Sequence, residues 1–108
     1  MKITLAGEEI EMRPTFERIR KVEKECGVDS IFSLAYKMRD GNVSYTDIVN
    51  IYWLFQEGAA YSQDVICDKI LADGLANHLQ QVGELLGDIL SGNGEKTKMD
   101  RDWETNKY

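Results

Sequence analysis

The residues of this chain that could carry out chemistry are few and widely separated. His78 is the only histidine, and the two cysteines, Cys26 and Cys67, stand far apart in the sequence. Zinc sites and redox motifs need cysteines or histidines in closely spaced groups, and none is present here. The sequence also has no nucleophile elbow or other local sign of a Ser-His-Asp triad. We therefore interpret His78 as a structural or surface histidine and both cysteines as reduced core thiols.

One stretch superficially resembles a phosphate-binding loop. It begins at Gly92 and reads GNGEKT. The spacing GxxxxGK[ST] is absent, and no strand is predicted before it or helix after it. We interpret it as a linker, and we expect no cofactor, no metal and no enzymatic activity.

Charge and hydropathy narrow the range of partners. Residues 92–108 contain four acidic and four basic side chains, so the net charge of −6 belongs to the rest of the chain. Binding of nucleic acid needs a concentrated basic surface, and the basic residues around Arg20 alternate with glutamates. The longest apolar run, Ile51–Phe55, is too short to span a membrane, and the N-terminus has no signal-peptide core. We expect a cytoplasmic protein that binds neither nucleic acid nor a membrane.

The elements of the fold can be predicted from local patterns. Alternating apolar positions in residues 1–13, on either side of a turn within residues 6–9, predict a β-hairpin. Helical spacing and capping residues predict four or five short helices after it. The expected helices run from Thr15 to Gly27, from Asp29 or Ser30 to Asp40-Gly41-Asn42, from Ser44 to Gly58, from Ser62 to Gly74, and from Gly74 to about Leu90. At Gly74 the chain either breaks between the last two helices or bends from one into the other.

These elements form one mainly α-helical domain with an N-terminal hairpin. The domain should cover residues 1–91, because the chain is too short for a second core. Residues 92–108 are polar and aperiodic, which predicts a flexible C-terminal tail.

Two helices carry more apolar or small residues than one packed face requires. In the third helix, Val49, Trp53 and Leu54 fall outside the main apolar stripe, so either this helix is buried all round or a partner covers part of it. In the fifth helix, a stripe of larger residues faces the core: Leu75, Leu79, Val82, Leu85, Leu86, Ile89 and Leu90.

Beside that stripe, the fifth helix carries a row of small residues that includes Gly83 and Gly87. Glycine is about 1 kcal/mol less favourable than alanine inside a helix, so something should benefit from close approach there. A packed neighbouring helix, a subunit contact or a loose helix would each explain this row. Our candidate interface residues are therefore Val49, Trp53, Leu54, Gly83 and Gly87.

The order of these features resembles a known family. The matching segments cover about residues 1–92 and are ITLAGEEIEMRPTFERIRKVEKECG, SIFSLAYKM, GNVSYTDIVNIYWLF and YSQDVICDKILADGL, followed by the leucine-rich helix. In this order they resemble phage tail assembly chaperones of the type found in gene transfer agents and related long-tailed phages.

The resemblance implies a non-enzymatic assembly factor. Such proteins bind the tape measure protein, and also the tail tube subunit, before the tube polymerises, and they are absent from the mature virion. We expect a client helix to bind apolar surface of the third and fifth helices. Two alternatives stay open: another phage structural component, such as a connector or tail terminator, and a small helical regulator that binds a protein. A homo-oligomer is also left open.

Overall fold

A β-hairpin followed by five α-helices makes up the computed structural model, which describes residues 1–92 apart from the side chain of Ala59. This confirms the predicted fold class. The predicted tail lies outside the described residues, except for Gly92. The elements are β1 (Lys2–Leu5), β2 (Glu8–Glu11), α1 (Phe16–Glu25), α2 (Ile31–Arg39), α3 (Tyr45–Phe55), the short 3-10 helix η1 (Glu57–Ala59), α4 (Gln63–Asp73) and α5 (Leu75–Ser91).

The hairpin presents one apolar face to the helices. Its strands pair in antiparallel register, with Ile3 opposite Ile10, and both of these side chains are buried. Ala6 and Gly7 form the turn, with φ angles of 50° and 83°. Two consecutive residues with positive φ match the twist of the paired strands, so the loop needs only these two residues.

Side-chain caps begin four of the helices where they were expected. Each capping oxygen accepts a hydrogen bond from the backbone N–H three residues later. Such a cap contributes about 1 kcal/mol to helix stability. The caps are Thr15, Ser30, Ser44 and Ser62. Between the last two helices, Gly74 adopts φ 95° and ψ 126°, so it breaks the helix rather than bending it.

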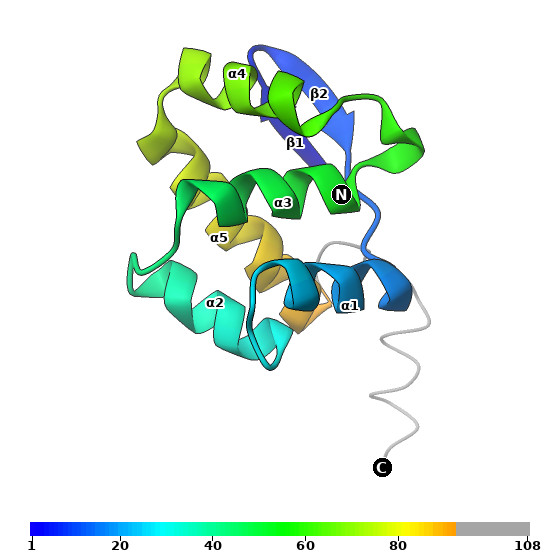
Figure 1. Ribbon diagram of the computed structural model, residues 1–108, viewed down its shortest axis with the longest axis vertical. Helices are drawn as coiled ribbons and strands as arrows, with labels where there is room; N and C mark the ends of the chain where they lie inside the picture. Colours follow the sequence, from blue (N-terminus) through cyan, green and yellow to red (C-terminus); the bar gives the residue numbers. More distant parts are fainter. Residues whose placement is uncertain (93–108) are drawn as a thin grey trace.

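Helix α3 lies at the centre of the molecule. Figure 1 shows it crossing the middle, with α4 and the hairpin on one side and α1 and α2 on the other. It contacts α1, α4 and α5. Ile51, Tyr52 and Phe55 are therefore fully buried. The sequence left open whether this helix is buried all round or partly covered by a partner. Burial in the core accounts for most of its apolar residues.

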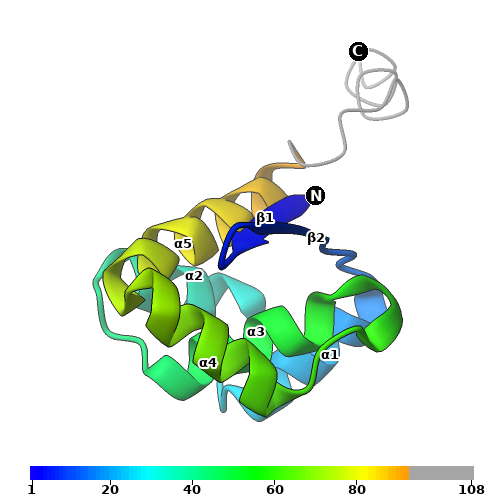
Figure 2. The same ribbon diagram turned by 90° about the horizontal axis from the view of Figure 1, so that it is seen from above.

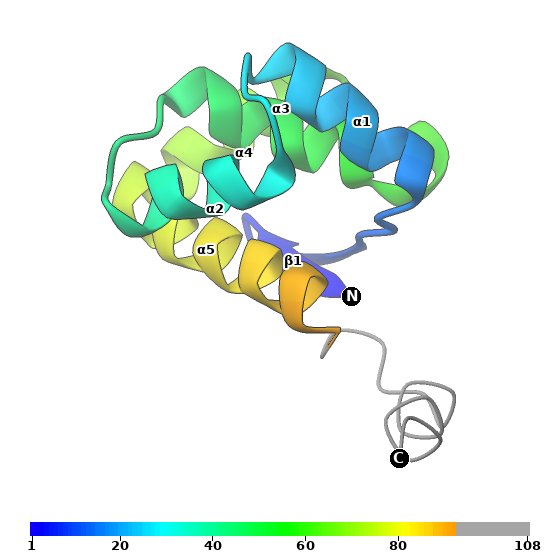
Figure 3. The same cartoon turned by 90° about the horizontal axis from the view of Figure 1, so that it is seen from below.

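The last helix joins the hairpin to the rest of the core. Figure 2 shows β1 beside α5, and β1 also contacts α4. The Thr4 backbone N–H donates to the Gln81 side-chain oxygen, and the Gln81 amide donates to the Thr4 carbonyl, so two hydrogen bonds link β1 to α5. Figure 3 shows α2 and α5 side by side, and the two helices are in contact. Among the described helices, none has the length and apolar character that a membrane span requires.

Candidate protein-binding groove

The structure separates the five predicted interface residues into two groups. Val49 belongs to the core, with 4% of its surface exposed, and Trp53 and Leu54 are half-buried against that core. Gly83 and Gly87 instead reach the surface on α5, where they line a groove. The two groups do not form one surface, because the groove lies between α2 and α5 and Trp53 and Leu54 do not line it.

The groove is open, and apolar or small side chains make up most of its lining. Its volume is about 630 Å³. Its α2 wall carries the aromatic rings of Phe32 and Tyr36, which are 60% and 58% exposed. The full lining is Phe32, Ala35, Tyr36, Met38, Arg39, Ala76, Leu79, Gln80, Gly83, Glu84, Gly87 and Leu90. Contiguous apolar surface of this kind is typical of protein interaction sites.

Sequence reasoning missed the α2 wall. The apolar positions that predicted this helix are Ile31, Leu34, Ala35 and Met38, of which all but the half-buried Ala35 are buried. Phe32 and Tyr36 are four residues apart, so they share a second face of the same helix. Two aromatic residues at this spacing, off the buried stripe, were the signal that could have revealed the groove.

Helix α5 has two apolar faces rather than the single predicted core-facing stripe. Val82, Leu85 and Leu86 are buried in the core. Leu75 and Leu90, which we had placed in the same stripe, are 42% and 36% exposed. Leu90 is exposed because it borders the groove, and no element within residues 1–92 covers it there. The second face, with Ala76, Leu79, Gly83, Gly87 and Leu90, is the α5 wall of the groove.

The α5 side of the groove carries one acidic lining residue, Glu84, and Asp88 lies just outside the lining. Asp88 follows Glu84 one turn later on the same helix. Within residues 1–92 neither carboxylate forms an ion pair, and the last turn of α5 contains no basic residue. On the α2 side, the Arg39 guanidinium lies 4.8 Å from the centre of the Tyr36 ring and 4.0 Å from an oxygen of Asp40. The α5 side is therefore the negative border of the groove.

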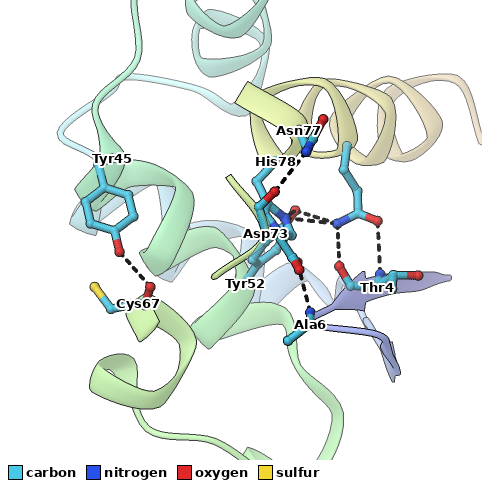
Figure 4. Close-up of polar contacts among 9 residues, drawn as sticks. Thr4, Ala6, Tyr45, Tyr52, Cys67, Asp73, Asn77 and His78 are labelled. Carbon is cyan, nitrogen blue, oxygen red and sulfur yellow. Dashed lines mark hydrogen bonds and ion pairs between the residues drawn. The ribbon is translucent and has the colours of Figure 1, made fainter. Parts of the chain in front are cut away.

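A separate polar cluster lies where the hairpin meets α4 and α5 (Figure 4). The Tyr52 hydroxyl is 2.9 Å from His78 Nδ1, and His78 Nε2 is 2.6 Å from a carboxylate oxygen of Asp73. The same Asp73 oxygen accepts a hydrogen bond of 2.8 Å from the backbone N–H of Ala6. Gln81 completes the cluster by donating to the Tyr52 hydroxyl at 2.8 Å.

Burial and hydrogen bonding explain the electrostatics of this cluster. The Ala6 N–H, and then His78, lower the pKa of Asp73 below its usual range, while burial raises the pKa of Tyr52. His78 is only 2% exposed. Because each of these groups is hydrogen-bonded within the fold, the cluster links the hairpin to α4 and α5. Of the two predicted places for His78, structural or surface, the structure shows a buried position within this cluster. The described residues contain no group of three side chains suited to bind a metal ion.

Both cysteines are free thiols, as predicted. Cys26 is buried, and burial raises the pKa of its thiol to about 12. Cys67 is half-buried against the core. A thiol whose pKa is raised this far is almost entirely protonated at neutral pH, so Cys26 is a poor nucleophile.

Comparison with known proteins places the chain in a family. The family model described as "Phage tail tube protein, GTA-gp10" matches residues 1–92. Neither the curated proteins nor the solved structures contain a match. The matched region includes the hairpin, all five helices and both walls of the groove. A match over so much of the 108 residues means that the chain belongs to the phage tail tube protein, GTA-gp10 family.

Proposed function

We propose that the protein is a non-enzymatic tail assembly chaperone that binds the tape measure protein. In this proposal it acts in the cytoplasm of the bacterial host, takes the tail tube subunit as a second partner, and is absent from the mature virion. Membership of a phage tail family supports a role among tail proteins. The observation that carries the proposal is the open apolar groove between α2 and α5.

The groove has the properties that a client-binding surface needs. Phe32 and Tyr36 expose aromatic surface, and such side chains supply much of the binding energy in protein interfaces. A net charge of −6 keeps a protein with this surface soluble. A groove between two helices also suits the packing of a third helix, which is how many proteins recognise helical segments.

The family description favours a second candidate function, in which the chain is itself a subunit of the tail tube. A connector, a tail terminator or a helical regulator would also use a protein-binding surface. Purified tail particles separate the structural components among these possibilities from a chaperone. A structural component would be present there in fixed stoichiometry, whereas we expect the chaperone to be absent.

Co-expression with the tape measure protein of the same phage tests the proposal. We expect the wild-type chain to keep that protein soluble, and the double variant Phe32→Ala/Tyr36→Ala to let it aggregate. Phe16→Ala is the matched control, because Phe16 is 76% exposed but lies on α1, outside the groove. Similar thermal unfolding of all three proteins would exclude misfolding as the cause. Aggregation of the tape measure protein beside the wild-type chain would overturn the proposal.

A further inference from the structure

We infer that the groove between α2 and α5 binds a single amphipathic helix whose flank is basic. This inference rests on the proposed function, because it names the chemistry of the partner segment bound at the same surface. It follows from the shape of the α5 wall and from the charges beside it.

The middle of the α5 wall lets another helix approach closely. Gly83 and Gly87 lie one turn apart and both line the groove. Apart from the neighbouring residues and the backbone of α5 itself, a Cβ atom built on either glycine meets no atom within 4 Å, so the space above the backbone there is empty. Side chains at the contact set the distance between packed helices, and glycine permits the shortest distances. A small side chain of the partner fits above these two glycines.

The size of the wall sets the length of the bound segment. Groove residues on α5 extend from Ala76 to Leu90. At 1.5 Å per residue this distance is about 21 Å, or roughly four helical turns. A partner helix of about 15 residues would therefore cover Phe32, Tyr36 and the α5 wall together.

The negative border of the groove selects basic side chains. Glu84 and Asp88 are four residues apart, so their like charges repel. Asp88 also lies at the C-terminal end of α5, where the helix dipole already disfavours an acidic residue. A lysine or arginine on the partner beside Glu84, which lines the groove, would relieve the repulsion between the two carboxylates. A second copy of this chain is a poor occupant, since each copy has a net charge of −6.

Two synthetic helical peptides test this inference on the full chain. Both carry alanine opposite the glycines and leucine on either side, and they differ only by lysine or glutamate on the flank. Fluorescence anisotropy should show that the lysine peptide binds about tenfold more tightly, as expected for two exposed charge pairs. The difference should shrink at high salt. Equal binding of the two peptides would overturn the inference.

Variants of the protein show where the peptide binds. Glu84→Lys/Asp88→Lys should reverse the preference for the lysine peptide. Asp64→Lys/Asp68→Lys makes the same change in net charge on exposed positions of α4, outside the groove, and should reduce the preference much less. Gly87→Leu should abolish binding of either peptide without unfolding the protein, since its side chain has free space. Unchanged binding by this variant would place the peptide elsewhere.

The tape measure protein separates failure of this inference from failure of the proposed function. If the lysine peptide binds as expected but the tape measure protein does not, the groove is supported and the client is wrong. If the tape measure protein binds and Gly87→Leu leaves its binding unchanged, the inference is overturned and the chaperone remains. Two further outcomes would also overturn it: a dimer that Gly87→Leu dissociates, or a peptide that binds only after residues 93–108 are removed.

Discussion

Replacement of Gly83 and Gly87 by alanine should stabilise the fold and weaken partner binding. Both glycines lie inside α5, and neither has the positive φ angle of the turn glycines such as Gly41. Alanine is about 1 kcal/mol more favourable than glycine in a helix interior. Apart from the neighbouring residues and the backbone of α5 itself, no atom lies within 4 Å of the added Cβ at either site, so no clash offsets this gain.

The size of the stabilisation follows from these two facts. Each single substitution should raise the free energy of unfolding by about 0.5 to 1 kcal/mol. For a folded part of this size, 1 kcal/mol raises the thermal midpoint by about 4 to 8 °C. The two sites are one turn apart, so the double variant should gain slightly less than the sum of the two single variants. The new methyl groups would hold a partner helix away from the backbone and weaken its binding by about 1 kcal/mol or more.

Urea and thermal unfolding, followed by circular dichroism, measure the stability of these variants, and peptide anisotropy measures their binding. Gly41→Ala is the control, because Gly41 has φ 72° and alanine should destabilise the protein there. Loss of stability at Gly83 or Gly87 would refute the argument that their surroundings are open. Higher stability with unchanged binding would refute the argument that the two glycines allow close approach.

Three further predictions concern the rest of the fold. Trp53→Ala should lower the free energy of unfolding by about 1 to 3 kcal/mol in urea, less than for a fully buried tryptophan, and leave peptide binding unchanged. Asp73→Asn should make stability less sensitive to acid. The pKa of Asp73 is lowered in the folded state, so its contribution is present above the usual aspartate range and is lost as the pH falls through the folded-state pKa. The difference between wild type and variant in urea should therefore be largest near neutral pH and should shrink in acid. Deletion of residues 93–108 should leave the thermal midpoint nearly unchanged, and a loss of several degrees would contradict the predicted limits of the domain.

The helices and the hairpin could be predicted because their signals are local. Thr15, Ser30 and Ser62 each accept a hydrogen bond from a backbone N–H three residues away, so a short stretch of sequence contains the whole interaction. The alternation of apolar and polar residues that predicts the hairpin is equally local. Only the tight turn differed in detail, because Ala6 adopts a positive φ angle that is uncommon for alanine.

The groove could be predicted only in part because it depends on how two helices pack. Helix propensity was enough to single out Gly83 and Gly87, since glycine is unfavourable in any helix interior. Phe32 and Tyr36 are ordinary residues of an amphipathic helix until α5 is placed beside them. Trp53 was predicted as a candidate interface residue because it lies on a polar face of its helix, but the core covers much of it.

The polar cluster could not be predicted at all for a similar reason. Tyr52, Asp73 and Gln81 come from three different helices, and no spacing in the sequence links them. Of these residues, only His78 stood out in the sequence, and the absence of other ligands near it predicted a structural or surface histidine. The hydrogen bonds that hold His78 in this cluster became visible only with the packed structure.

The C-terminal half of α5 combines several features that weaken a helix. Serine or threonine caps begin the first four helices, and basic residues lie in the last turns of α1 and α2, whereas the last turns of α3 and α4 lack a base, as that of α5 does. In α5, two glycines, two acids four residues apart and a last turn without a base occur together. Each of these features weakens the helix by a few tenths to about 1 kcal/mol. When several residues that weaken a helix occur together beside a groove, the surface is typically a functional one. A partner helix with small and basic side chains would offset these effects.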